Sequence, residues 1–127
     1  GKPVLHLALK RNMVPVVLHT KAQNPQEIAS EADVVVACCG VAELLDEKWI
    51  KDDAIVIDVG INTKNDETGK SVLCGDVNAL AVSEYASLVT AVPGGIGSVT
   101  SALLFANTLK GWYMVNNRKE LRFDFEV

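Results

Sequence analysis

Short runs of β-branched and other apolar residues recur along the chain, and they constrain its fold more than any other feature. They cover residues 14–19, 33–38, 54–59 and 88–92, and nearly every position in each run is apolar. Strands with this composition are typically covered on both faces, as in a parallel sheet between helices. Helical segments separate the runs, so we expect an α/β fold with a doubly wound, mostly parallel sheet of the Rossmann type.

Helical patterns fill most of the intervals between these runs. We expect helices over residues 1–12, from 24 or 25 to 31, 78–86 and 98–114, the last being the longest. Their buried faces would consist of apolar residues at helical spacing, namely Val4, Leu5, Ala8 and Leu9 in the first helix and Val99, Leu103, Ala106 and Leu109 in the last. Residues 62–70 are polar and contain a glycine, which predicts an exposed loop before a short strand at 72–74.

Composition excludes several classes of protein. The 127 residues fit one domain, and 49% hydrophobic residues argue against extensive disorder. The net charge of −4 argues against a broad nucleic-acid surface, and no apolar stretch is long enough to span a membrane. Three cysteines, two of them adjacent, suit reduced and mostly buried thiols better than disulfides or a metal site. We therefore expect a cytoplasmic protein without a metal, with a mitochondrial location as the alternative.

Ligands of doubly wound sheets bind beyond the carboxyl ends of the strands, so the residues after each run are the candidate site. Thr20 and Lys21 follow the first run, where many dinucleotide-binding sheets carry an acid for the ribose of NAD. A hydroxyl and a cation could instead accept the 2′-phosphate of NADP. The alternative is a solvated loop with an incidental lysine.

Glycines follow the second and third runs. Gly40 could let the backbone approach a ligand closely, although a simple turn would also explain it. Gly60 and Ile61 could let a flat ring lie against the backbone. Cys39 lacks an evident neighbour that would lower its pKa, which argues against a nucleophilic role.

The fourth run leads into Pro93-Gly94-Gly95-Ile96-Gly97, directly before the longest predicted helix. Successive backbone N–H groups and the positive end of a helix could hold a carbonyl, a carboxamide or a phosphate here. The lysine of a Walker A loop is absent, so this is not a P-loop. A tight connection from strand to helix is the structural alternative.

These segments together resemble a known family. Residues 93–97 with Thr100, Leu103-Leu104 and Asn107-Thr108-Leu109 resemble the PGGVGPMT…LL.NTL signature of methylenetetrahydrofolate dehydrogenase/cyclohydrolases. Other segments resemble that family in the same order: residues 19–21 (HS[RK]T), 32–37 with Gly40 (ADI..AAVG), 49–62 (WIK.GAVVIDVGIN) and 75–77 (VGDV).

The resemblance implies a partial NAD(P)-binding Rossmann domain over residues 1–115, beside a folate site. Members oxidise 5,10-methylenetetrahydrofolate with NADP and hydrolyse the methenyl product. NAD is the alternative cofactor. By this resemblance the cofactor would be bound by Thr20 near the adenosine ribose, Ile61 near the nicotinamide, and Lys21, Gly40, Gly60 and Thr100. The folate substrate would be bound by Pro93, Gly94, Gly95, Ile96 and Gly97.

The chain also departs from the family pattern. Ser98-Val99 replaces the usual Pro-Met, and the Gly-Arg-Ser phosphate loop with its preceding strand is not among these residues. The family's catalytic tyrosine–lysine motif and its folate-binding acid are also absent, so no catalytic residue is assigned. We expect a sheet incomplete at its N-terminus, in a fragment that is inactive alone and belongs to a homodimeric full-length enzyme.

Two other functions fit the same sequence. The chain could be a catalytically incomplete dimerisation or interaction module of this fold, or part of another amino-acid-dehydrogenase-like oxidoreductase. Residues 116–127 would form a tail, and the alternating apolar residues of 121–127 suit an edge strand or an arm against another chain.

Overall fold

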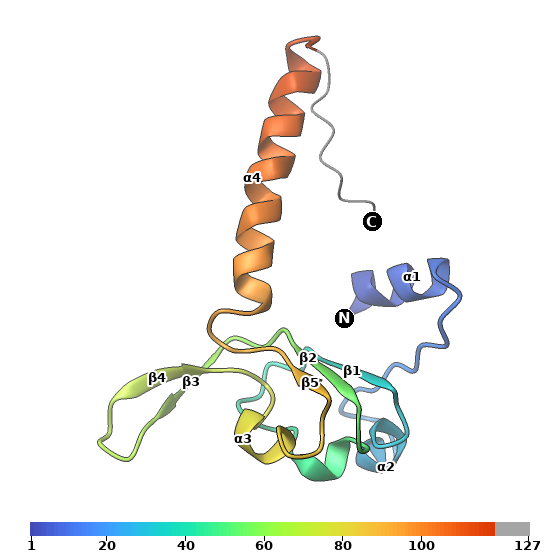
Figure 1. Ribbon diagram of the computed structural model, residues 1–127, viewed down its shortest axis with the longest axis vertical. Coiled ribbons are helices and arrows are strands. Elements are labelled where there is room, and N and C mark those ends of the chain that lie inside the picture. The colour runs from blue at the N-terminus through green and yellow to red at the C-terminus, as the bar shows by residue number, and fades with distance from the viewer. Residues whose placement is uncertain (119–127) are drawn as a thin grey trace. The chain divides into compact units, whose positions relative to one another are not determined.

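Three of the four apolar runs form a parallel sheet (Figure 1). The structure is a computed structural model that describes residues 1–118. The sheet contains β1 (Val34–Ala37), β2 (Ile55–Asp58) and β5 (Leu88–Val89), in the order β1–β2–β5. Val34 lies opposite Ile55, and Leu88 lies opposite Ile55 on the other side. The prediction of an α/β fold with a parallel sheet is confirmed.

The hydrophobic core lies against one face of this sheet. Ala54, Val56 and Val82 are completely buried, and the cluster also contains Val35, Ala37, Leu45, Ile50 and Val77. The helices α2 (Pro25–Ala29) and α3 (Ala79–Val82) both lie below the sheet in Figure 1, α3 toward the left and α2 toward the right. Both are shorter than predicted. Asn78 caps the N-terminus of α3, and its side chain accepts a hydrogen bond from the Ala81 N–H at 3.2 Å.

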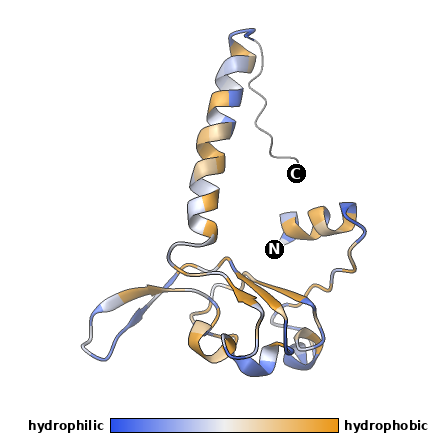
Figure 2. Cartoon of the chain, viewed as in Figure 1, coloured by the Kyte–Doolittle hydropathy of each residue, from blue (hydrophilic) through white to orange (hydrophobic). Residues whose placement is uncertain are grey.

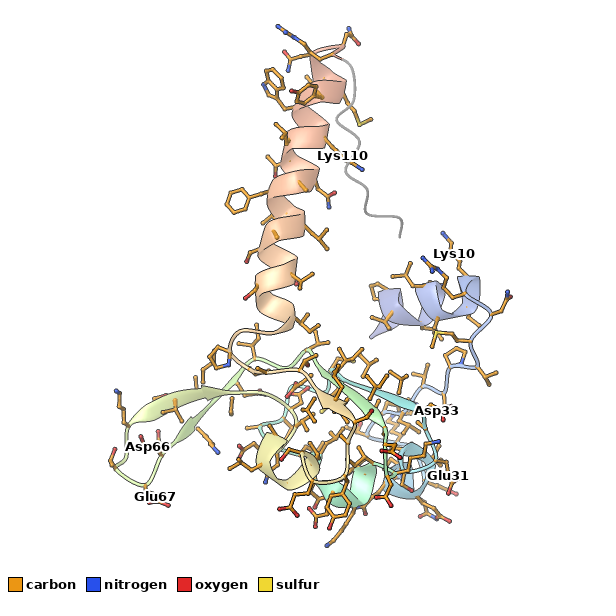
Figure 3. The ribbon with its side chains drawn as sticks, in the orientation of Figure 1. Lys10, Glu31, Asp33, Asp66, Glu67 and Lys110 are labelled. Atoms are coloured by element: carbon orange, nitrogen blue, oxygen red, sulfur yellow. The ribbon has the colours of Figure 1, made fainter. Side chains whose placement is uncertain are left out.

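An antiparallel hairpin replaces part of the predicted loop. β3 (Asn62–Asn65) pairs with β4 (Ser71–Cys74), with Asn62 opposite Cys74. The expectation of a loop over 62–70 was wrong for the first four residues, because pairing uses backbone groups and polar side chains can stay exposed, as those of Thr63, Lys64 and Asn65 do. At the tip, the Asp66 carboxylate accepts from the Thr68 and Lys70 N–H groups, both at 2.9 Å. Figure 3 shows Asp66 and Glu67 at this tip.

The predicted strand over residues 14–19 is absent. The segment contains no strand residue, and Val14 is 92% exposed. Pro15 has no N–H to donate, and no strand within residues 1–118 pairs with the segment. Extended backbone without a partner is not stabilised as a strand.

The first helix is present, but its apolar face is not buried. α1 spans Lys2–Lys10, with a proline in the first turn as predicted. Val4 is 41% exposed and Leu9 is 54% exposed, so the predicted burial of this face was wrong. The described residues provide no surface that covers it.

The longest helix, α4, spans Ile96–Val115 and contains no buried residue. Of its predicted buried positions, Val99 is 56% exposed and Leu109 is 40% exposed, so that prediction was wrong as well. The apolar residues of the helix are not gathered on one face, and Figure 2 shows hydrophobic positions (orange) interspersed with more polar ones along its length. Its Ser101 and Thr108 hydroxyls donate to carbonyls one turn earlier, at 3.1 and 2.8 Å. A helix of this kind is normally buried by other protein.

The chain forms two compact units, Gly1–Ile96 and a second that begins at Gly97. The boundary predicted between 1–115 and 116–127 stays a prediction, because residues 119–127 lie outside the described part. Within residues 1–118, no helix is long and apolar enough to cross a membrane.

The three thiols are all free, but only Cys74 is buried. Cys38 and Cys39 are exposed, so the expectation of mostly buried cysteines was wrong. They lie after the end of β1, where the chain leaves the sheet. The part of the chain that is described contains no group of acidic, histidine or cysteine side chains able to hold a metal ion.

Candidate functional site

A buried carboxylate lies at the end of the central strand. Asp58 is the last residue of β2 and is 3% exposed. Its Oδ1 accepts from the N–H groups of Gly60 at 2.9 Å and Asp76 at 3.0 Å, and its Oδ2 accepts from the Val77 N–H at 3.0 Å. The N–H of Asp58 donates to the Thr90 hydroxyl at 2.8 Å. Asp58 therefore joins the ends of β2 and β5 to the segment that follows the hairpin.

A second carboxylate, Asp76, is completely buried beside the first. Its Oδ2 accepts from the N–H groups of Cys39 at 2.6 Å and Gly40 at 2.9 Å. Its Oδ1 accepts from the side-chain amide of Asn62 at 2.8 Å. Burial raises the pKa of Asp76, but the bonds from Gly40, Asn62 and Cys39 together outweigh burial, and the net pKa lies below its ordinary value. Asp76 is therefore ionised at neutral pH.

The two carboxylates and their partners form one hydrogen-bonded group, which we call the strand-end network. Its members are Asp58, Asp76, Asn62, Thr90 and the N–H groups of Cys39, Gly40, Gly60 and Val77. The network connects the carboxyl ends of all three parallel strands. Within residues 1–118, no buried side-chain nitrogen or oxygen lacks a partner. The chain itself thus fixes the edge where ligands of such sheets bind.

Gly60 is required by this packing. A side chain at Gly60 would overlap the carboxylate of Asp76. The sequence pattern offered this glycine as a surface for a ligand, whereas its absent side chain makes room for a buried acid. The next residue, Ile61, is 73% exposed and is the apolar group available at this strand end.

Gly40 has a different environment. Its φ is +71°, which favours glycine, and a side chain placed there would meet no heavy atom within 4 Å. Its N–H donates to Asp76, so it is already used, but its Cα faces open space. Because β1 and β2 are neighbours, Gly40 and Ile61 follow adjacent strand ends. A flat group could pack against open backbone at one and apolar surface at the other.

The Pro-Gly-Gly-Ile-Gly turn follows β5 as predicted. The Val92–Pro93 peptide bond is cis, and Gly94 has a φ of +106° with open space beside it. A side chain at Gly95 would overlap the carbonyl of Ala91, so the turn is tight. Ile96 begins α4, and Gly97 and Thr100 belong to the second unit. Both the tight connection and an exposed backbone surface are therefore present in this turn, and its role in binding stays a prediction.

Thr20 and Lys21 are exposed in a turn that contains no ladder bonds. The Lys21 N–H donates to the imidazole Nδ1 of His19 at 3.1 Å, and the Ala22 N–H donates to the His19 carbonyl at 2.8 Å. No acidic side chain of residues 1–118 forms an ion pair with Lys21. The ammonium group is therefore accessible to an anion.

Two further features lie near the network. A cavity of about 160 Å³ is lined by Asp58, Thr90 and Leu73 among others, and also by Lys64 and Glu43, which form an ion pair at 2.6 Å. Gly40, Gly60 and Ile61 do not line this cavity. Burial raises the pKa of the Cys39 thiol, as do its hydrogen bond to Asp76 and the charge of that residue. A raised pKa makes the reactive thiolate less available, and the absence of a nucleophilic role for Cys39 stays a prediction.

Sequence reasoning assigned no role to the side chains of Asp58, Asp76, Asn62 and Thr90. A signal was present, because Asp58 interrupts an apolar strand and a buried acid requires donors. The identity of those donors was not readable, since the two acids are 18 residues apart and Asp76 contacts residues 36 and 37 positions away. The structure brings Gly40 and Gly60 together around Asp76.

A family model for the NAD(P)-binding domain of tetrahydrofolate dehydrogenase/cyclohydrolases matches residues 1–116. The chain is 44% identical over 118 residues to the bifunctional protein FolD of Clostridioides difficile, covering 93% of this chain and 40% of that protein. It is 42% identical over 113 residues to bifunctional protein FolD 2 of Arabidopsis thaliana, covering 87% and 38%. The chain thus spans about 40% of the length of the curated relatives it matches.

Two solved structures that are similar to this chain are also of FolD enzymes. The bifunctional enzyme FolD from Campylobacter jejuni superposes with a TM-score of 0.77 at 37% identity, over 87% of this chain and 38% of that one. The enzyme from Trypanosoma brucei, solved with NADP and an inhibitor, gives a TM-score of 0.77 at 35% identity, over 86% and 38%. The parallel sheet described above is therefore similar to the corresponding domain of these enzymes.

Proposed function

The chain belongs to the NAD(P)-binding domain family of tetrahydrofolate dehydrogenase/cyclohydrolases, and on this premise we propose that it is the nucleotide-binding part of such an enzyme. The intact protein would oxidise 5,10-methylenetetrahydrofolate with NADP and hydrolyse 5,10-methenyltetrahydrofolate. The observation that carries this proposal is the family match over residues 1–116, which includes every candidate site residue.

The geometry at the strand ends supports a nicotinamide cofactor. Gly40 offers open backbone, and Ile61 offers an exposed apolar side chain on the neighbouring strand end. Gly60 would contribute to cofactor binding indirectly. Its N–H donates to Asp58, and this bond holds the backbone next to Ile61 in place. When bound, the nicotinamide would supply the hydride acceptor. The residues of this chain would orient its ring and exclude water from one side.

Thr20 and Lys21 would bind the other end of the cofactor. Their exposed hydroxyl and ammonium groups suit a ribose and its 2′-phosphate, and Lys21 has no competing acidic partner within residues 1–118. Thr100 would complete the cofactor site. Pro93, Gly94, Gly95, Ile96 and Gly97 would line the folate pocket. No catalytic residue is assigned, because proton transfer would fall to residues outside these 127, and the chain alone would be inactive.

Substitution of Lys21 tests the proposal directly. In the intact source protein, Lys21→Ala should weaken NADP binding by about tenfold, since a hydrogen bond to a charged group is lost, and should leave NAD binding unchanged. Lys70→Ala, at the exposed tip of the hairpin, serves as the control and should change neither. Dissociation constants would be measured by titration with each dinucleotide.

Two outcomes would contradict this proposal. Equal weakening of both cofactors would show that Lys21 does not contact the 2′-phosphate. Failure of the unsubstituted protein to bind either dinucleotide would favour the interaction module, which the exposed apolar surface of α4 also supports. Binding of a folate analogue to the intact protein would be measured next. Binding would support the folate enzyme, and no binding would support another dehydrogenase of this fold.

We further propose that the intact protein is a homodimer that does not bind nucleic acid and that it is located in the cytoplasm, with a mitochondrial location as the alternative. The exposed apolar residues of α4 support assembly with further protein, and the net charge of −4 of these 127 residues argues against a nucleic-acid surface on this part of the protein. Analytical ultracentrifugation and cell fractionation would test assembly and location.

A further inference from the structure

Both turns that face the proposed cofactor are attached to a single carboxylate. Oδ2 of Asp76 accepts from two successive N–H groups, those of Cys39 and Gly40, in the turn after β1. Oδ1 accepts from the side chain of Asn62, which follows Ile61 after β2. The two carboxylate oxygens of Asp76 therefore accept hydrogen bonds from the turns that follow two different strands, β1 and β2.

The burial of Asp76 makes these bonds costly to replace. The residue is completely buried, so water cannot substitute for a lost acceptor without rearrangement. Bonds between N–H groups and an ionised carboxylate are also stronger than those between neutral groups. In contrast, Gly40 itself is exposed, with no side chain to hold it in place. The position of its backbone therefore depends on the acid beneath it.

We infer that Asp76 is a positioning residue for cofactor binding, holding the backbone of Gly40 and the Ile61–Asn62 segment in the arrangement that meets the nicotinamide end. This inference rests on the proposed function. Asp76 does not touch the cofactor in this arrangement, because its carboxylate is enclosed by the Cys39, Gly40 and Asn62 donors. It acts through the turns that those donors belong to.

The pairing with Asn62 allows a rescue experiment. In Asp76→Asn, the oxygen facing Asn62 becomes an NH₂ donor and the charge is lost; Asn62 can turn its amide so that its oxygen accepts, but the bonds from Cys39 and Gly40 then end on a neutral, weaker acceptor. In Asn62→Asp, two carboxylates face each other. In the double variant, the amide introduced at position 76 would donate to the carboxylate introduced at position 62, while the amide oxygen would still accept from Cys39 and Gly40. The hydrogen-bonding pattern is thereby restored with the partners exchanged.

The experiment measures the NADP dissociation constant and the urea midpoint of the intact source protein and its variants, at a temperature where each is folded. Asn62→Asp should weaken NADP binding by about tenfold, Asp76→Asn should weaken it by about threefold, and the double variant should recover to within about threefold of the unsubstituted protein. Asp66→Asn removes a charge at the hairpin tip and should leave the dissociation constant unchanged. In steady-state assays, the KM for NADP should rise more than kcat falls.

A purely structural role predicts a different result. If Asp76→Asn lowers the urea midpoint but leaves the dissociation constant unchanged, or if the double variant fails to recover binding, the inference is wrong. If Asp76→Asn does not fold, Asn62→Ala replaces it and should weaken NADP binding by about threefold, the loss of one hydrogen bond; unchanged binding would again overturn the inference. Failure of the unsubstituted protein to bind NADP or NAD would overturn the proposed function and this inference with it.

Discussion

The strand-end network and helix α4 differ in how far the described residues satisfy their interactions. In the network, Asp58 and Asp76 are 3% and 0% exposed, and all four carboxylate oxygens accept hydrogen bonds. In α4, no residue is buried, and Phe105 is 78% exposed. The first region is completed by the chain itself, whereas the second has apolar surface that only additional protein would cover. The hydrogen bonds of the network are therefore complete without any residue of α4.

The largest expected effect is the loss of an acceptor in the network. Asp58→Ala would leave three buried N–H groups without a partner, those of Gly60, Asp76 and Val77. At about 1–3 kcal/mol for each, the free energy of unfolding should fall by about 4 kcal/mol or more. Urea unfolding followed by circular dichroism would measure it. Asp66→Ala, at the solvent-exposed hairpin tip, is the matched control; an equal loss there would break the comparison.

An intermediate effect is expected from adding one methyl group to each region. Gly60→Ala forces a side chain into the carboxylate of Asp76 and should cost about 2–3 kcal/mol by overpacking. Gly111→Ala in α4 meets no heavy atom within 4 Å and should stabilise the helix by about 0.5–1 kcal/mol. Thermal unfolding of both variants would show opposite signs. A loss of stability at Gly111 would mean that another surface approaches it closely.

The smallest effect is expected at the exposed apolar surface of α4. In the 127-residue chain, Phe105→Ala should change the free energy of unfolding by about 0.5 kcal/mol or less, because the side chain is mostly in water. Chemical denaturation would measure the change. A loss of about 3 kcal/mol, as for a buried phenylalanine, would show that α4 is covered within this chain and would remove the contrast.

The sequence predicted the elements that local patterns determine. Residues 33–38 and 54–59 formed β1 and β2 because their apolar composition and their burial agree, and the Pro-Gly-Gly-Ile-Gly turn led into the longest helix as expected. Residues 14–19 have the same composition but no strand beside them in the described part of the chain. Strand formation depends on a partner, and that information is not contained in a single segment.

The candidate site was only partly predictable for a related reason. The alternation of elements predicted that Gly40 and Gly60 follow successive strands. It did not predict that the side chain of Asp76 lies between these two glycines in space. Asp76 reaches Gly40 across 36 residues of sequence, and only the tertiary structure brings the two together. The buried faces assigned to α1 and α4 were wrong because spacing shows which residues share a side, and not whether anything packs there.

The composition of α4 has a consequence for assembly. Its hydroxyl groups at Ser101 and Thr108 are bonded to the helix's own backbone, and its apolar residues extend round the whole circumference. Rotation about the helix axis would therefore change the free energy of burial very little. The orientation that α4 adopts against another surface should therefore depend on how well the two surfaces fit. The features of α4 that would determine this fit are the missing side chain at Gly111 and the edge-to-face rings of Trp112 and Tyr113.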